Sequence, residues 1–434
     1  LNTGSFNTAV GSFCLDANTT GGQNSGVGDY SLSGNTTGDF NTAMGQGGLL
    51  SNTTGDFNTA LGCNSLQSNT TANGNTSGGY NSMLTNTTGY SNTGFGIYTL
   101  RQNTTGTNNV ALGQSALLNN TTATLNVSIG YNSMYTNTVG AYNTCVGGNA
   151  MDSNTTGGSN VAVGYIALKE NTTGGKNTAV GKGALQSNTS AYHQTAVGYH
   201  SLNQVTTGIE NTAVGYFSLT NATTGTNNVA VGRDAFRVMT TGSQNVAVGD
   251  LAGDSATTGE KNTFIGRNAG ATVTTGSQNV MLGSQAGYDT TTASQHLYIA
   301  RNNTPAGNAA TWIHGNENGA LYQGNNSSSF TTVSDERIKK DIVDSSKGLA
   351  KIDALQVRNF NYRTPEEITV DGLTGCDASG LQTGVIAQEI ASVLPEAVTA
   401  NNAGQKQVST DPIFWAMVKA IQELSAKVKA LEDA

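Results

Sequence analysis

Residues 160–176 read NVAVGYIALKENTTGGK, and the same seventeen-residue pattern recurs without insertion or deletion from Asn7 to about Ala300. From Asn7 to Asn279 its first residue is asparagine at every recurrence but one, where Gln194 takes the slot. These asparagines are Asn7, Asn24, Asn41, Asn58, Asn75, Asn92, Asn109, Asn126, Asn143, Asn160, Asn177, Asn211, Asn228, Asn245, Asn262 and Asn279. An unbroken period of this length indicates that each repeat is one supersecondary unit stacked on its neighbours. The sequence therefore predicts a solenoid shaft over residues 1–301.

The repeat itself is typical of strands and turns. Seventeen residues are too few for a pair of helices, and the apolar residues do not fall at helical spacing. In the first residues of the pattern, Val161 and Val163 share one face while Asn160 and Ala162 share the other. This alternation is that of a β-strand.

Other positions of the repeat indicate how a coil closes. A second short strand is expected at residues 167–168, where a small residue precedes leucine. Gly164 ends the first strand and recurs from Gly11 to Gly283, so its slot needs a positive φ or a close backbone approach. In the block NTTG at residues 171–174, the asparagine should hydrogen-bond its own downstream backbone and the glycine should be left-handed. We predict one two-strand coil of a β-roll or β-helix per repeat, and coils about 4.8 Å apart give a rod on the order of 80 Å long.

The apolar content of each coil predicts the oligomeric state. About two aliphatic residues per repeat face inward, and a single roll so lightly filled would bury too little surface to offset its ordering entropy. We therefore expect a homotrimer. The N-x-A-V/I-G strand also resembles the head repeats of trimeric autotransporter adhesins, which implies a trimeric β-roll. Those repeats are usually nearer fourteen residues, so the handedness and the coil shape stay open.

Charge changes the character of the chain near Ser334. Residues 1–333 carry 22 Asp, Glu, Lys and Arg residues, whereas the much shorter segment 334–434 carries 26. We therefore expect a shaft, a neck over residues 302–333, and a globular tail over residues 334–434. The net charge of −8, with no basic patch, gives no case for nucleic-acid binding. No apolar stretch is long enough to insert in a membrane, and the chain, which begins at Leu1, is expected to be the C-terminal part of a longer protein.

Cysteine and histidine give no pattern of a metal, cofactor or disulfide site. The cysteines lack a CxxC spacing and the histidines lack ligand spacing: Cys14, Cys63, Cys145, Cys376, His193, His200, His296 and His314. We interpret the cysteines as isolated thiols and expect no metal and no cofactor.

The tail carries several motifs in order. Residues 334–342 read SDERIKKDI, residues 384–390 read GVIAQEI, and Leu394-Pro395-Glu396 follows. A terminal helix is expected from about Asp411. Its apolar residues alternate three and four apart, which predicts a three-stranded coiled coil: Phe414, Met417, Ile421, Leu424, Val428 and Leu431.

These motifs resemble the C-terminal intramolecular chaperone domain of phage tail fibres and tailspikes, the endosialidase type that processes itself. The resemblance implies a small α+β domain in which Ser334 attacks the Val333–Ser334 peptide bond and Lys339 acts as general base. A serine hydroxyl needs such a base, and no substrate need be bound because the target carbonyl is covalently adjacent. A bare Ser-x4-Lys spacing also fits a helix cap at Ser334 and a solvated lysine.

The fold class predicted is therefore mainly β: a trimeric β-solenoid followed by an α+β chaperone domain that ends in a trimeric coiled coil. The leading functional hypothesis is the distal, adhesive part of a phage tail fibre, folded in the host cytoplasm and then part of the virion. Its enzymatic activity would be a single self-cleavage. Its expected partners are two further copies, other virion tail proteins, and a host cell-surface receptor for which glycan is a candidate. The alternatives are a cell-surface trimeric adhesin and an ice-binding solenoid.

Overall fold

A computed structural model describes residues 3–288, 290–300, 311–315, 321–323, 340–363, 367–368, 380–400 and 405–434. The chain divides into two units, Leu1–Phe330 and Thr331–Ala434. Each unit is described by itself.

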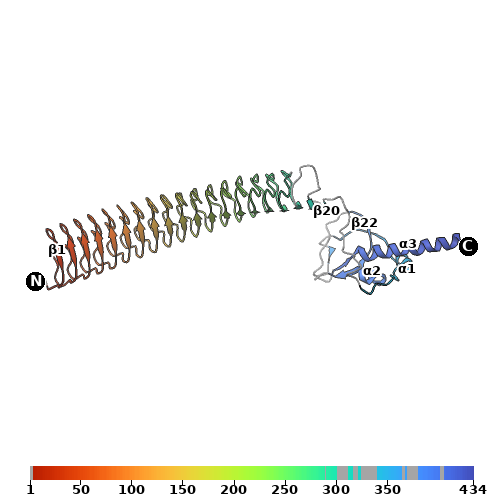
Figure 1. The fold of residues 1–434 in the computed structure, drawn as a ribbon, viewed down its shortest axis with the longest axis horizontal. Helices are drawn as coiled ribbons and strands as arrows, with labels where there is room; N and C mark the ends of the chain where they lie inside the picture. The colour runs from red at the N-terminus through yellow and green to blue at the C-terminus, as the bar shows by residue number, and fades with distance from the viewer. Residues whose placement is uncertain are drawn as a thin grey trace. The chain divides into compact units, whose positions relative to one another are not determined.

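The first unit is a solenoid with one short strand in each coil (Figure 1). Its strands are β1 (Thr8–Val10), β2 (Ser25–Val27), β3 (Thr42–Met44), β4 (Thr59–Leu61), β5 (Thr76–Gly78), β6 (Thr93–Phe95), β7 (Val110–Leu112), β8 (Val127–Ile129), β9 (Thr144–Val146), β10 (Val161–Val163), β11 (Thr178–Val180), β12 (Thr195–Val197), β13 (Thr212–Val214), β14 (Val229–Val231), β15 (Val246–Val248), β16 (Thr263–Ile265), β17 (Val280–Leu282) and β18 (Leu297–Ala300). Neighbouring strands are parallel, and each residue pairs with the one seventeen positions on, as Val161 does with Thr178. The predicted seventeen-residue solenoid is confirmed.

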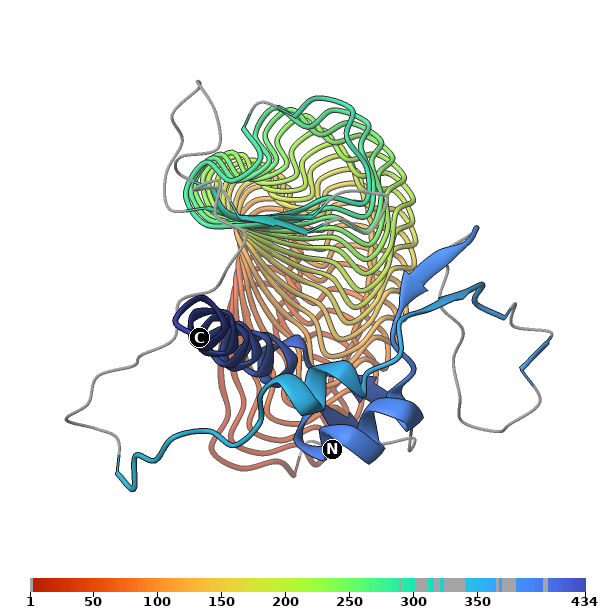
Figure 2. The same cartoon turned by 90° about the vertical axis from the view of Figure 1, so that its right-hand side faces the viewer.

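We number the positions of a coil from its first asparagine, so that equivalent residues form columns along the rod. Column 1 contains Asn160, column 5 Gly164 and column 12 Asn171. Figure 2 looks along the rod and shows the coils one behind another, each rotated slightly relative to the last.

The strand has one inner and one outer face, as its alternation predicted. In β10, Ala162 of column 3 is fully buried, while Val161 and Val163 of columns 2 and 4 are exposed. Gly164 has a φ of 136°, and a Cβ there would lie 2.6 Å from the carbonyl carbon and oxygen of Gly181. Column 5 thus needs glycine both for its positive φ and for the close approach of the next coil.

The second strand expected in each coil is absent, and this prediction is wrong. Residues 167–168 lie in a turn, where Leu168 is left-handed with a φ of 50°. Columns 7 and 17 are left-handed as well, as at Ile166 and Lys176. These residues curl the chain too tightly for an extended strand. The sequence did not predict these left-handed turns, because residues other than glycine avoid positive φ in most contexts.

Backbone hydrogen bonds between coils stabilise these unusual turns. The N–H of Leu168 donates to the carbonyl of Ala184 over 2.9 Å, and the N–H of Ile166 donates to the carbonyl of Gly148 over 3.0 Å. Column 13 adds a side-chain bond, because the Thr172 hydroxyl donates to the carbonyl of Thr189 over 2.9 Å. The backbone N–H and C=O groups of these turns therefore have hydrogen-bond partners in the neighbouring coils.

Two asparagine ladders fill the interior beside the apolar residues. Asn160 accepts the N–H of Asn177 at 3.0 Å, and its Nδ2 donates to the Gly174 carbonyl at 3.0 Å. In column 12, Asn171 Nδ2 donates to Asn154 Oδ1 at 2.8 Å and to the same Gly174 carbonyl at 3.0 Å. The expected bond from asparagine to its downstream backbone is confirmed. Gly174 is not left-handed, however: a Cβ there would meet the amide oxygen of Asn171, so the position is small for contact rather than for φ.

The apolar core is complete within one chain. Leu168 and Ala162 have no exposed surface, and the same holds for most residues of columns 3 and 9. The premise that a single coil would be too lightly filled is therefore wrong, because buried asparagine amides occupy the space that more aliphatic residues would need. A homotrimer stays a prediction and must rest on other surfaces.

The core becomes more apolar toward the C-terminal coils. After Asn188, column 12 carries no further asparagine but instead Val205, Ala222, Met239, Ala256 and Val273, all fully buried. In the same coils, large and small residues exchange columns: Phe264 occupies column 3, and Gly253 and Gly270 occupy column 9 beside its ring. A large residue in column 3 is thus accommodated by glycine in column 9, a compensation of size between the two columns.

Replacing one residue of the column 12 ladder should destabilise the middle coils. In Asn154→Val, Asn137 Oδ1 loses the donor now at 2.7 Å and Asn171 Nδ2 loses one of its two acceptors, and both groups are buried. We expect a loss of about 1 to 3 kcal/mol in the stability of these coils, measured as faster amide hydrogen exchange there. The control Thr156→Val changes an exposed hydroxyl, and equal effects of the two substitutions would contradict the ladder's role.

Two antiparallel strand pairings follow the last parallel coil of the solenoid. Strand β18 pairs with β19 (Thr311–Gly315), which pairs with β20 (Leu321–Gln323). This change of direction brings Tyr298 opposite His314.

The second unit is a small α+β assembly. It contains α1 (Leu349–Asp353), the pair β21 (Arg358–Phe360) and β22 (Gln382–Gly384), α2 (Ala387–Val393), a 3-10 turn (Pro395–Ala397), the pair β23 (Val398–Ala400) and β24 (Lys406–Val408), and α3 (Thr410–Glu432). Ile390, Leu394, Ala397 and Ala416 form its buried core. The terminal helix expected from about Asp411 is confirmed as α3.

Candidate functional site

The residues predicted for self-cleavage, Val333, Ser334 and Lys339, lie outside the described residues. So does the helix start expected at Ser334. The description resumes at Lys340, and residues 340–347 form an exposed segment without helix or strand. Ile342 and Val343 within it are 63% and 85% exposed.

The second motif of the tail forms a packed corner. Residues 384–390 run from the end of β22 into α2, where Ile390 is buried. Leu394 is also buried and precedes Pro395, which begins the 3-10 turn. Arg358 on β21 holds Glu389 of α2 by two hydrogen bonds of 2.9 and 3.2 Å. This motif therefore builds the domain's core and one of its edges.

The exposed segment joins the domain at α1. Its helix begins after Gly348 without a side-chain cap of its own, and the N–H of Leu349 donates to Glu423 Oε2 of α3 at 2.8 Å. Lys347 forms a 2.5 Å ion pair with Glu396, and its hydrogen bond lowers the pKa of that carboxyl. Lys351 donates to the carbonyl of Val393 at 2.9 Å. The chain that leads away from the candidate cleavage site is thus anchored on α3 and the 3-10 turn.

Helix α3 has two apolar faces, and among the described residues only one of them packs against the rest of the domain. Ala416 and Ala420 are buried, and Ile413 packs against the core. The predicted coiled-coil residues are all exposed: Phe414, Met417, Ile421, Leu424, Val428 and Leu431. Each large apolar residue left in water is unfavourable, so this second face is a candidate for contact with other chains.

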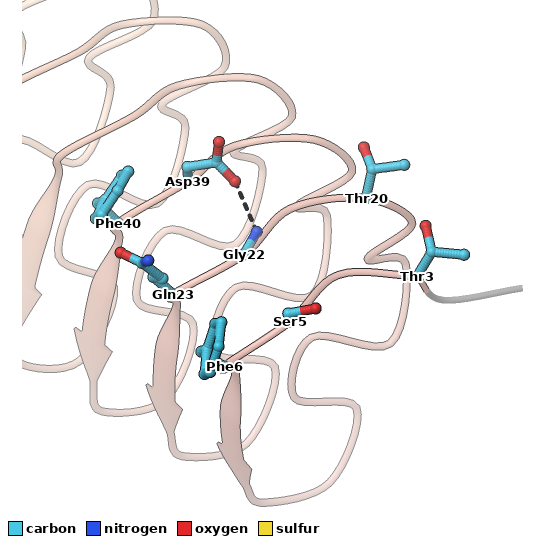
Figure 3. A pocket seen from close by; sticks show the side chains of 8 residues that line it. All are labelled: Thr3, Ser5, Phe6, Thr20, Gly22, Gln23, Asp39 and Phe40. Carbon is cyan, nitrogen blue, oxygen red and sulfur yellow. Dashed lines mark hydrogen bonds between the residues drawn. The ribbon is translucent and has the colours of Figure 1, made fainter.

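A hollow lies at the first coils of the shaft, and its lining residues are drawn in Figure 3. It is lined by Thr3, Ser5, Phe6, Thr20, Gly22, Gln23, Asp39 and Phe40. Its one carboxylate, Asp39, accepts the Gly22 N–H at 2.6 Å. Asp56 accepts the N–H of Asp39 in the same way at 2.7 Å. The acids here continue a column of inter-coil bonds and form no pair suited to acid-base catalysis.

The structure brings together two histidines that sequence spacing did not relate. His314 Nε2 lies 3.2 Å from His296 Nδ1, which lies 3.3 Å from the Tyr298 hydroxyl. Across the described part of the chain, no three His, Cys, Asp or Glu side chains gather as metal ligands. Only the antiparallel return of β19 creates this contact, so the repeat pattern could not predict it.

The thiols that the structure describes are free: Cys14, Cys63 and Cys145. Burial raises the pKa of the Cys145 thiol to about 12, so it stays protonated and unreactive at neutral pH. Cys376 lies outside the described residues. Within the described ranges, no helix combines the length and apolar character needed to cross a membrane.

Comparison with known protein families gives one match. Residues 334–399 match the family described as the chaperone of endosialidase, whose members are self-cleaving intramolecular chaperones. The match begins at Ser334 and ends before α3. No curated protein and no solved structure matches the chain. A β-solenoid followed by this chaperone domain fits a phage tail fibre or tailspike.

Proposed function

We propose that the chain is the distal part of a homotrimeric phage tail fibre that attaches to a host cell. In this proposal the tail, residues 334–434, directs trimer assembly and then cuts itself off at Val333–Ser334. The observation that carries the proposal is the family match, which starts at the serine expected to act. The shaft serves as the rigid adhesive element, retained in the virion.

The proposed reaction uses two side chains. Ser334 Oγ attacks the carbonyl carbon of Val333 while Lys339 Nζ takes the hydroxyl proton. The C–N bond breaks and the Ser334 nitrogen takes a proton, which leaves Val333 esterified to Oγ. Water then hydrolyses the ester to a free carboxylate at Val333 and a free hydroxyl at Ser334. Each molecule reacts once, because the nucleophile departs with the tail.

The exposed face of α3 supports the trimer. Its apolar residues follow a heptad pattern, and a second face of the same helix already packs against the domain core. The two roles therefore do not compete for the same side chains. Three parallel α3 helices would bring three chain ends together before the shafts pair, which reduces the entropic cost of long-range register.

A charge in this face should prevent assembly. In Ile421→Glu, a side chain that is 64% exposed in the single chain would place a carboxylate in the seam of the coil, where three such charges repel. We expect the mass in analytical ultracentrifugation to fall from three chains to one. Gln422→Glu adds the same charge to the neighbouring exposed residue off the seam and should stay trimeric. A wild-type protein that sediments as one folded chain would refute the trimer.

The receptor is a host surface molecule, and a glycan is our candidate because the shaft exposes many tyrosines. Tyr131, Tyr142 and Tyr165 are each more than half exposed. Aromatic rings with a polar end bind amphipathic ligands well. We propose that the shaft also joins other virion tail proteins.

A further inference from the structure

The outer face of the strand ladder is an uncharged surface in which a column of mostly aliphatic residues runs beside a column of mostly threonine and valine. We call it the strand face and define it as columns 2 and 4 of β1–β18. Column 2 is threonine or valine in every strand except at Ser25 and Leu297. Column 4 contains Val10, Val27, Met44, Leu61, Gly78, Phe95, Leu112, Ile129, Val146, Val163, Val180, Val197, Val214, Val231, Val248, Ile265, Leu282 and Ile299.

Much of this surface is open to solvent in the single chain. Met44 is 52% exposed, Phe95 42% and Ile265 42%. The intervening column 3 is buried in nearly every strand, so the exposed columns are the outer side of the same strands. Figure 1 shows these strands stacked in one row along the shaft.

Charge avoids the strand face completely. None of its residues is Asp, Glu, Lys, Arg or His, although the coils carry such residues in columns 6, 7, 10, 11, 16 and 17. Arg233 and Asp250 of column 6, for example, form a 2.8 Å ion pair beside the face. Depletion of charge at the centre with polar residues at the rim is the composition of a protein interface.

The size of the strand face suits an interface between several copies. With about 3.3 Å per residue along a strand and about 4.8 Å between strands, the face measures roughly 7 by 80 Å. That is roughly 500 Å² per chain, of which about half belongs to the mostly aliphatic column 4. Three such faces brought together would remove roughly 1,500 Å² in all, shared among three pairs of chains. Each pair therefore buries less than the standard interface of about 1,600 Å², and the seam adds to the contact proposed at α3.

The regular spacing of side chains on the strand face favours another copy of this chain as its binding partner. Side chains recur on this face once per coil over the whole shaft, and only an object with the same repeat distance can fit every coil without drifting out of register. Another copy of this chain has that spacing by construction. We propose that the strand faces of three parallel copies turn toward a common axis and form the seam of the shaft. This inference rests on the homotrimer of the proposed function and adds the surface by which the shafts meet.

Engineered cysteines test the seam in the full chain. Val163→Cys places a thiol in column 4, and the control Thr156→Cys places one on an exposed residue of column 14 in the same region. Both carry Cys14→Ser, Cys63→Ser and Cys376→Ser, which leaves the buried Cys145 as the one native thiol. A disulfide needs Cα atoms within about 7 Å, so only residues near the axis can link two chains.

After mild oxidation, we expect covalent two-chain species on a non-reducing denaturing gel for Val163→Cys and single chains for Thr156→Cys. Sedimentation of the same samples before oxidation gives the number of chains. A three-chain mass without a Val163→Cys link overturns the seam and leaves the trimer standing, as does a link formed by Thr156→Cys alone. A one-chain mass overturns both proposals.

Discussion

Replacing Ser334 with alanine is expected to abolish self-cleavage and to leave assembly intact. The hydroxyl is the proposed nucleophile, and alanine offers no atom that could attack the Val333 carbonyl. Intact-mass analysis of purified wild-type protein should show two fragments, residues 1–333 and 334–434. The Ser334→Ala protein should show one chain of full length that still sediments as a trimer.

Neighbouring residues supply matched controls for this result. Ser346→Ala removes an exposed serine from the segment that leads into α1 and should not affect cleavage. Lys339→Ala should slow cleavage strongly, whereas Lys340→Ala, at the exposed residue next in the chain, should leave it fast. If a folded wild-type trimer stays uncut, or if Ser334→Ala is cut at the same bond, the assignment of Ser334 is wrong.

The strand and its glycine could be read from the sequence because both follow local rules. Alternation places Val161 and Val163 on one face and Ala162 on the other, although only the structure shows that the alanine face is the inner one. The recurring Gly164 slot indicates a backbone that other residues cannot adopt. The seventeen-residue period then fixes the register of every pair, as the structure confirms. Repetition makes such a fold predictable since one coil, once understood, describes all the others.

The coil's turns were not predictable by the same rules. Leu168 adopts a positive φ that leucine avoids in isolation, and inter-coil hydrogen bonds and complete burial are what hold it there. The burial of the asparagine ladders was not predictable either. Asn160 and Asn171 look like turn and surface residues in sequence, yet both are buried with their amides hydrogen-bonded to equivalent residues. Stacking creates both environments, so neither is a property of a single repeat.

The candidate site was predicted by resemblance rather than by geometry. Ser334 and Lys339 lie five residues apart, and only the surrounding motifs distinguish this pair from a helix cap and a surface charge. The family match from residue 334 supports the domain. The roles of the two residues stay predictions. Heptad spacing predicted the exposed apolar face of α3. Only the folded domain shows that a second face, with Ala416 and Ala420, packs against the core.

Deleting residues 334–434 from the gene is expected to have the largest effect on the shaft. Without the tail, three free chains must find a common register along about seventeen similar coils, and a shift by one coil costs little in each contact. We therefore expect aggregated or monomeric shaft. The shaft produced by self-cleavage of the full chain lacks the same residues but should remain trimeric and resist detergent on heating.

The two preparations have the same covalent structure, so any lasting difference between them must be kinetic. In the proposed trimer, intrachain inter-coil bonds such as those of Asn160 hold each coil folded and the seam holds the chains together, so we expect the assembled shaft to unfold slowly. On this proposal the tail acts by lowering the barrier to assembly and is not needed for the contacts within the finished shaft. Its removal then leaves the shaft without an easy route back through the nucleating state. Should the gene-truncated shaft assemble as readily as the processed one, measured by sedimentation and by heat resistance in detergent, residues 334–434 do not act as a chaperone.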